Sequence, residues 1–165
     1  MTGQADQRGV LCLILTPAGY VDGTFHLPLK HNLVDALNRG EALFRLTQVR
    51  LPGSDGPVPF FALERGAVIL VAPQDPKEHP PVAPHGALKD HQTWWLLQGG
   101  VVVEGTLTLL QGVRVSDHLL HRTGFVVIKN AVLRARQPDG SYASTSLGPW
   151  VALQSASAIG ASESG

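Results

Sequence analysis

Residues 11–51 read LCLILTPAGYVDGTFHLPLKHNLVDALNRGEALFRLTQVRL, and residues 93–133 read TWWLLQGGVVVEGTLTLLQGVRVSDHLLHRTGFVVIKNAVL. Sliding the first stretch forward by 82 positions aligns it with the second without a gap. The identical pairs are Leu15/Leu97, Val21/Val103, Gly23/Gly105, Thr24/Thr106, Leu27/Leu109, Asp35/Asp117, Leu37/Leu119 and Leu51/Leu133. A repeat of this length predicts two copies of one small module.

The domain boundaries follow from the repeat and from the stretch between its copies. Residues 72–91 hold five prolines among polar residues, a composition that favours an extended spacer over a helix or a strand ladder. The C-terminal SASAIGASESG has little apolar bulk to bury and is predicted to be disordered. We therefore expect a first repeat at 9–73, a linker at 74–91, a second repeat at 92–155 and a disordered tail at 156–165.

Each copy is predicted to contain five strands and one short helix. The strands are expected at 10–16, 20–27, 42–51, 58–63 and 67–72 in copy one, and at 93–98, 101–110, 125–135, 141–147 and 149–155 in copy two. Apolar residues spaced i,i+4 predict the helices at 32–39 and 115–122, between the second and third strands. Gly23 and Gly105, inside the second strands, predict a bend that curls a short sheet into a barrel.

Composition excludes several classes of function. The formal net charge is zero and only four residues are lysine, so the chain lacks the basic field that supplies sequence-blind affinity for DNA. Cys12, the single cysteine, lies in an apolar run and is predicted to be a buried thiol. That run, from Val10 to Leu15, is interrupted by Pro17 and Gly19 and is too short for a signal peptide or a membrane span. We expect a cytoplasmic protein with no membrane or DNA partner.

One stretch of copy one resembles a known small-barrel family. Ala62-Leu63-Glu64-Arg65-Gly66 is similar to the second signature of Sm-like proteins, in which an apolar strand runs into Arg-Gly before the last strand. The hairpin, the glycine bend and the two short closing strands add to this resemblance. It implies an all-β protein of two tandem five-stranded barrels, Sm-like and thus of the SH3-like type, packed as a pseudo-two-fold pair.

A second resemblance covers the region of the helix in both copies. It is to uncharacterised bacterial proteins with tandem small barrels, which have an Arg-Leu-Ser-Asp-x-Leu-Asn segment after a hairpin and then a Phe-x-x-Leu-Thr strand. The matching positions are Arg114, Val115, Ser116, Asp117 and Leu119 in copy two, and Leu33, Asp35, Leu37, Asn38, Leu43, Leu46 and Thr47 in copy one. This resemblance implies a fold and no activity.

The carboxylates and histidines favour structural roles. Asp35, Ser116 and Asp117 stand at predicted helix starts, where a side-chain oxygen can accept hydrogen bonds from free backbone amides. General acid or base catalysis would need a positioned second group, and no such pair is evident. His118 and His121 are spaced i,i+3, but no further Cys or His lies at a zinc-ligand spacing near them. We expect no catalytic residue, no metal and no cofactor.

Sm-like barrels bind RNA through loop side chains, which makes RNA a candidate ligand. Base stacking and phosphate contacts of this kind would come from Lys30, His31, Asn32 and Arg65 in copy one. Copy two has Gly112, Val113 and Arg114 at the first three of these positions, and the charge footprint is weak.

Trp94 and Trp95 are the candidate protein contacts. Because they are adjacent in a predicted strand, their side chains point to opposite faces and only one can enter its own barrel. The other tryptophan is either covered by the first copy or available to another chain.

The sequence therefore predicts a non-enzymatic binding or scaffolding module that acts through protein contacts, either with an unknown partner or by self-association through strand edges. Two alternatives stay open. One is RNA binding through the loops of copy one, and the other is a sensor that holds a small molecule or nucleotide between the repeats.

Overall fold

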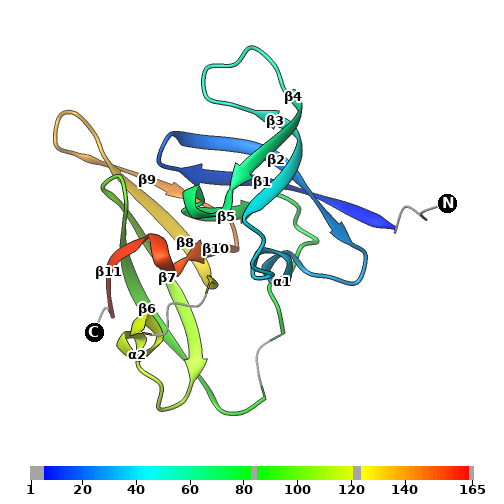
Figure 1. Cartoon of the computed structure of the whole chain (residues 1–165). Helices are drawn as coiled ribbons and strands as arrows, with labels where there is room; N and C mark the ends of the chain where they lie inside the picture. The colour runs from blue at the N-terminus through cyan, green and yellow to red at the C-terminus, as the bar shows by residue number, and fades with distance from the viewer. Residues whose placement is uncertain (1–5, 83–84, 121–123, 164–165) are drawn as a thin grey trace. The chain divides into compact units, whose positions relative to one another are not determined.

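The computed structural model describes residues 6–82, 85–120 and 124–163 (Figure 1). These residues form antiparallel strands with two short α-helices, which confirms the predicted all-β class. The chain divides into two compact units, unit 1 (Met1–Pro81) and unit 2 (Val82–Gly165). The division falls within the proline-rich stretch that was predicted to be the linker.

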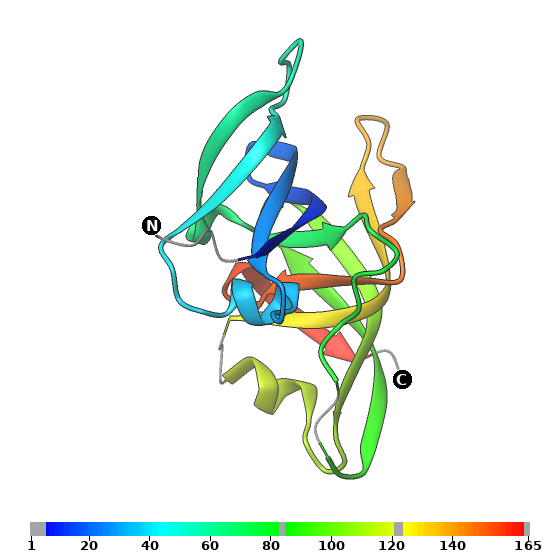
Figure 2. The same cartoon turned by 90° about the vertical axis from the view of Figure 1, so that its right-hand side faces the viewer.

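Unit 1 is an antiparallel sheet whose strands follow the order β5-β1-β2-β3-β4. The short helix α1 joins β2 to β3, and a single turn of 3-10 helix, η1, joins β4 to β5 (Figures 1 and 2). The elements are β1 (Gln7–Thr16), β2 (Gly19–Pro28), α1 (Leu33–Leu37), β3 (Leu43–Arg50), β4 (Val58–Glu64), η1 (Arg65–Ala67) and β5 (Leu70–Pro73).

Unit 2 has the same succession of elements with one extra strand. Its strands follow the order β11-β6-β7-β8-β10, and β9 pairs with the far end of β8. The elements are β6 (Leu88–Leu97), β7 (Val101–Leu110), α2 (Val115–Leu120), β8 (Phe125–Arg136), β9 (Tyr142–Ser146), β10 (Trp150–Gln154), η2 (Ser155–Ser157) and β11 (Ala158–Glu163).

The end of unit 2 corrects the predicted strand assignment. β10 pairs with the start of β8, Phe125 with Gln154, as β4 pairs with the start of β3, Leu43 with Glu64. β11 then closes on β6, as β5 closes on β1. The predicted disordered tail at 156–165 is therefore wrong over β11. Its small residues bury little surface, but pairing with β6 satisfies their backbone groups.

The start of β6 also lies earlier than predicted. Leu88 to His91 pair with the last four residues of β7, so the second repeat begins within the stretch assigned to the linker at 74–91. Pairing with β7 extends β6 toward its N-terminus, into a segment where apolar and polar residues do not alternate. Of the predicted linker, the described residues 74–82 and 85–87 lie outside the strands.

The core of unit 1 follows the alternation of β1 and the apolar face of α1. Val10, Cys12 and Ile14 are fully buried, while Leu11 between them is half-exposed. Leu33 and Leu37 of α1 are also fully buried. Burial of each such aliphatic side chain contributes about 2 kcal/mol of transfer free energy. Because α1 is too short to be stable alone, its packing against the core is what stabilises it.

The first hairpins of the two units differ by one residue in their turns. In unit 1 Thr16 pairs with Gly19 across a two-residue turn, whereas in unit 2 Leu97 pairs with Val101 across three residues. As a result Thr93, and not Trp94, takes the place of Cys12 in the ladder. The gapless alignment, which matched Leu15 with Leu97, is thus out of register by one residue in the first strand.

Both units have the same β-bulge between the second and third strands. Between the pairs Asp22–Arg50 and Thr24–Thr47 the third strand has an extra residue, and the same bulge separates Glu104–Val132 from Thr106–Lys129. The bulge places Gln48 and Asn130 at positive φ, 51° and 52°. Gly23 and Gly105 face these bulges, which is the bend that the sequence predicted.

Substituting Gly105 tests this close approach. A Cβ at Gly105 would lie 2.4 Å from Ile128 Cγ2 and 2.9 Å from the backbone oxygen of Lys129, whereas at Gly23 it would lie 3.1 Å from Val49 Cγ2. We expect Gly105→Ala to lower the free energy of unfolding by about 2–3 kcal/mol, and Gly23→Ala by about 1 kcal/mol or less. Gly160→Ala, where nothing lies within 4 Å, is the control. Chemical denaturation measures all three, and equal losses for all would contradict this account.

The strained residue at each bulge gives a second prediction. Gln48 is exposed and adopts a left-handed conformation that costs a residue with a Cβ about 1 kcal/mol. We expect Gln48→Gly to raise the midpoint of thermal unfolding. Asn130→Gly should raise it less, because asparagine tolerates this conformation better than glutamine. A larger gain at Asn130 than at Gln48 would show that the bulge is not strained in this way.

Candidate functional site

An open groove of about 800 Å³ lies in unit 1 where β2 and β3 separate, and we call it the β2–β3 groove. The ladder between the two strands ends at the pair Phe25–Leu46. β2 continues to Pro28 paired with β1, and the first residues of β3 pair with β4. The groove therefore forms because β2 and β3 diverge, β2 staying paired with β1 and β3 with β4.

The floor of the groove is apolar. It is formed by Phe25 and Leu27 of β2, Leu37 of α1 and Phe44 of β3, and all four side chains are buried. The rings of Phe25 and Phe44 meet edge to face, with centroids 5.7 Å apart and an angle of 70° between the planes. This contact fixes the two strands at the point where they diverge.

The wall of the groove contains residues from the outer face of the sheet. Alternation along the strands places His26, Arg45 and Phe60 on this face, and each is exposed. Phe60 is 59% exposed to solvent, and Leu43 at the rim is 46% exposed. The His26 Nε2 atom lies 2.6 Å from Thr47 Oγ1, which fixes the imidazole against the wall. An exposed aromatic ring beside a buried apolar floor is a feature of binding surfaces.

The rim carries charge. Arg39 and Glu41 lie in the connection from α1 to β3, and Arg45 lies in the wall. Among the described residues, neither Arg39 nor Arg45 forms an ion pair with a carboxylate. The Arg39 Nη2 atom lies 3.2 Å from His31 Nε2, a contact that leaves its charge in place.

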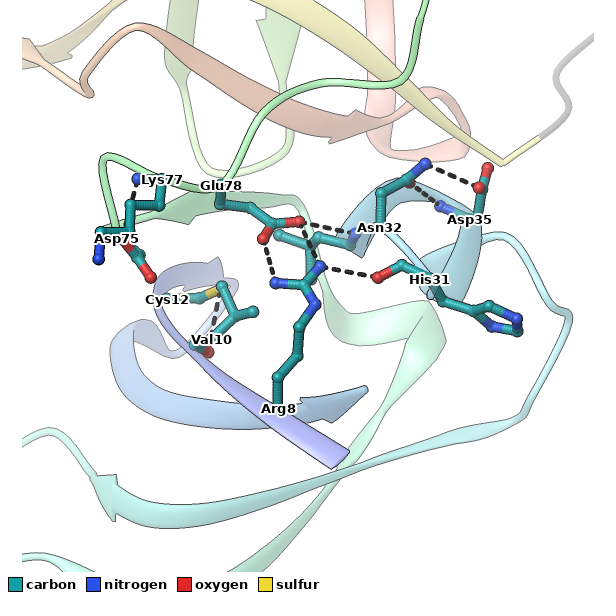
Figure 3. Close-up of polar contacts among 10 residues, drawn as sticks. Arg8, Val10, Cys12, His31, Asn32, Asp35, Asp75, Lys77 and Glu78 are labelled. Carbon is teal, nitrogen blue, oxygen red and sulfur yellow. Dashed lines mark hydrogen bonds and ion pairs between the residues drawn. The ribbon is translucent and has the colours of Figure 1, made fainter. Parts of the chain in front are cut away.

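A buried carboxylate holds the helix that ends the groove. Glu78, whose side chain is 3% exposed, pairs with Arg8 through both carboxylate oxygens (Figure 3). The Glu78 Oε1 atom also accepts a hydrogen bond of 3.0 Å from the backbone amide of Leu33, the first residue of α1. The hydrogen bond to Glu78 raises the pKa of the Arg8 guanidinium above its ordinary value, so the guanidinium keeps its positive charge.

The N-cap of α1 is Asn32, which corrects the role predicted for Asp35. The Asn32 Oδ1 atom accepts a hydrogen bond of 2.9 Å from the amide of Asp35, and its Nδ2 atom donates one of 2.7 Å to Asp35 Oδ2 (Figure 3). Asp35 is the third helical residue, and it contacts the cap through its backbone amide and its side chain instead of providing the cap. Asn32, predicted as an RNA contact, is engaged in this structural role.

Arg65, the second predicted RNA contact with a structural role, holds the other end of α1. Its guanidinium donates a hydrogen bond to the backbone oxygen of Leu37 and lies 5.9 Å from the centre of the Phe44 ring. Lys30 and His31 are exposed in the turn before α1, and the His31 backbone oxygen accepts from Arg8. The structure thus leaves two of the four predicted RNA contacts as exposed side chains.

Unit 2 anchors its helix with different residues. The Glu163 Oε1 atom lies 3.4 Å from the amide of Val115, the first residue of α2, and 3.2 Å from His91 Nδ1. Asp117 accepts a hydrogen bond of 3.3 Å from the amide of Arg114, as its predicted role at the helix start requires. Ser116 is the second helical residue, so its predicted role as the cap is wrong. His121 lies outside the described residues.

The two tryptophans point to opposite faces, as adjacent strand residues must. Trp95 is fully buried and donates a hydrogen bond of 2.8 Å from Nε1 to Thr93 Oγ1, so its predicted role in a protein interface is wrong. Trp94 is half-buried, and the Arg134 guanidinium lies 4.9 Å from its ring centre. Arg134 is held there by Glu104 at 2.8 Å, so the cover of Trp94 is itself fixed.

Other chemistry is limited in the part of the chain that the structure describes. Cys12 is buried as predicted, and burial raises the pKa of its thiol far above the ordinary value. No three His, Cys, Asp or Glu side chains of the described residues are arranged to hold a metal ion. In the same residues, no helix has the length and apolarity needed to cross a membrane.

Comparison with known proteins returned no relative: no family model, no curated protein and no solved structure matches the chain. The chemistry of the groove therefore has to be read from its own residues.

Sequence reasoning missed Phe60, Arg45 and Arg39. A signal for Phe60 was present, because Phe60 and Phe61 are adjacent in a strand and one of them must face outward. Which one does so depends on the pairing with β3, where Phe60 is opposite Thr47 on the outer face and Phe61 is opposite buried Leu46. The arginines carried no signal, since their place beside the groove depends on where β2 and β3 diverge.

Removing the Glu78 carboxylate tests the anchor of α1. Glu78→Ala leaves Arg8 without its buried partner and the amide of Leu33 without its acceptor, so we expect a loss of about 3 kcal/mol in the free energy of unfolding. Glu64→Ala, which removes an exposed carboxylate from β4, should change it by less than about 0.5 kcal/mol. Urea denaturation measures both. Similar values for the two variants would mean that Glu78 does not anchor the helix.

Proposed function

We propose that the protein is a non-enzymatic binding module that acts through contacts with other proteins, and that the β2–β3 groove is its contact surface. The observation that carries this proposal is the combination of a buried apolar floor, an exposed aromatic ring at Phe60 and two arginines that have no carboxylate partner in the described part of the chain. Binding to such a surface is favourable when the partner covers the apolar groups and supplies charges opposite to those of the arginines.

We further propose that each unit is a small Sm-like barrel and that the two units arose by internal duplication. The strand order β5-β1-β2-β3-β4, the glycine-and-bulge bend and the helix between the second and third strands support this reading. Unit 2 supports the duplication with the same bulge and the same succession of β10, η2 and β11. Arg65 of the Sm-like stretch has Ser155 as its counterpart in unit 2, in the first position of η2.

Self-association is one form that these contacts can take. β4 and β11 each have a single neighbouring strand in the described sheet order, and an open strand edge is a template for pairing with another chain. Light scattering coupled to size-exclusion chromatography gives the mass in solution. A monomer at all concentrations would restrict the proposal to contacts with other proteins.

RNA binding is the second candidate function, because Phe60 with Arg45 and His26 could stack a base and contact phosphate. Lys30 and His31 would extend that surface. This function requires nucleic acid to elute with protein that was purified without nuclease, with an absorbance excess that ribonuclease removes. A clean protein peak would count against RNA and leave protein contacts as the function.

Substituting Phe60 tests the groove as a protein contact. We expect a library of displayed random peptides to yield binders of the full chain whose affinity falls at least about tenfold in Phe60→Asp, since an exposed aromatic anchor dominates a small interface. Competition between each selected peptide and its labelled copy measures this loss.

The matched control is Tyr142→Asp. Tyr142 has the same 59% exposure as Phe60 and lies on β9 of unit 2, away from the lining of the groove. Its substitution should leave the affinity unchanged. Binders that are lost in Tyr142→Asp and kept in Phe60→Asp would place the contact surface elsewhere.

A further inference from the structure

We infer, on the basis of the function proposed above, that the partner of the β2–β3 groove is an extended peptide segment in which an apolar side chain is flanked by carboxylates. Three features of the groove support this chemistry: an open strand edge, an apolar floor of limited length and a rim with excess positive charge. Each restricts the ligand in a different way.

The open edge is at the start of β3. The backbone oxygen of Ala42 accepts from the amide of Arg65 on the β4 side, and backbone groups of successive strand residues point to opposite edges. Leu43 therefore directs its amide and carbonyl toward β2, and β2 has no residue paired with it. An extended peptide can pair with Leu43 in the way that added strands pair with sheet edges.

The floor accepts an apolar side chain. Phe25 and Phe44 form its base, and the exposed ring of Phe60 stands at one side. A peptide paired with Leu43 would turn alternate side chains toward this base, because side chains alternate along an extended strand. Burial of one aliphatic or aromatic side chain of the peptide in the groove would favour binding.

The charges favour carboxylates on either side of that residue. Arg39 and Arg45 contribute two positive charges and Glu41 one negative charge, so the groove has a net positive charge in a chain whose overall charge is zero. Guanidinium groups form two parallel hydrogen bonds with a carboxylate. The same two arginines would oppose a basic peptide.

A nucleic-acid strand fits these features less well. Binding of single strands uses successive aromatic platforms along a continuous basic track. In the groove, Phe60 is the exposed aromatic residue of the described lining, and Phe25 and Phe44 are buried. We therefore assign the groove to a peptide, and an RNA ligand is an outcome that the experiment below can reveal.

The experiment measures fluorescence anisotropy of labelled probes with the full chain. The acidic probe is a peptide of about nine residues that alternates Glu or Asp with Val, Leu and Phe, long enough to span the groove when extended. The basic probe replaces each acid by lysine, and a third probe is an oligouridylate of similar length. A fourth is the acidic peptide with its central amide N-methylated, which removes one donor for strand pairing.

We expect the acidic probe to bind and the other three to bind at least about tenfold more weakly. In Arg45→Glu the acidic probe should lose at least about tenfold in affinity and the basic probe should gain, a reversal that misfolding cannot produce. Arg136→Glu, a change at an exposed arginine of unit 2, is the control and should alter neither affinity. Arg39→Glu gives a second test at the rim.

Equal affinity of the acidic and basic probes, or no binding of the acidic probe at about 1 mM, would overturn the inference. Tighter binding of the oligouridylate that depends on Arg45 would overturn it in favour of RNA. The selected peptides described above separate this result from failure of the proposed function. Binders that need Phe60 but carry no acidic residues would leave the groove as a protein contact and remove only the partner chemistry.

Discussion

The end of the β2–β3 groove depends on one salt bridge, between Glu78 and Arg8. α1 has only five residues and could not persist as an isolated helix, so its place is fixed by tertiary contacts. Glu78 accepts from the first amide of the helix while Arg8 balances its charge, and Arg65 holds the last helical carbonyl at Leu37. Burying a carboxylate this deeply costs free energy that only a paired cation and satisfied hydrogen bonds can offset. The helix therefore has a defined position, and so does the floor residue it contributes.

The two units reach this arrangement with different basic residues. In each, a glutamate from or after the closing strand reaches the first amide of the helix, and a side chain of the first strand stands beside that glutamate. The side chain is Arg8 in unit 1 and His91 in unit 2. Thr93 pairs with Gly105 as Cys12 pairs with Gly23. Two residues earlier in each first strand, His91 of unit 2 therefore corresponds to Val10 of unit 1, and not to Arg8. The common requirement is thus an acceptor for the first amide of the helix, and the side chain beside that acceptor is the part that differs.

Local patterns in the sequence were sufficient for the features that depend on local physics. The glycine bends, the two helices, the buried thiol and the opposed tryptophans all follow from spacing or from residue type. The register of the first strand did not, because one extra residue in a glycine turn shifts every later comparison by one position. β11 was missed because its residues are small and its order comes from pairing with β6, about sixty residues away in the chain. The structural roles of Asn32 and Arg65 were missed because a polar or charged side chain is visible in a sequence, whereas its backbone carbonyl or amide partner is visible only in the fold.

The two units also differ in a way that matters for spectroscopy. All three tryptophans, Trp94, Trp95 and Trp150, belong to unit 2, and two of them are buried. Intrinsic tryptophan emission therefore reports on the packing of unit 2. Unit 1, which contains the groove, has tyrosine and phenylalanine as its aromatic fluorophores. Far-ultraviolet circular dichroism detects both units together. Comparing the two signals during unfolding resolves the melting of each unit in the intact chain, without a label and without cutting the protein.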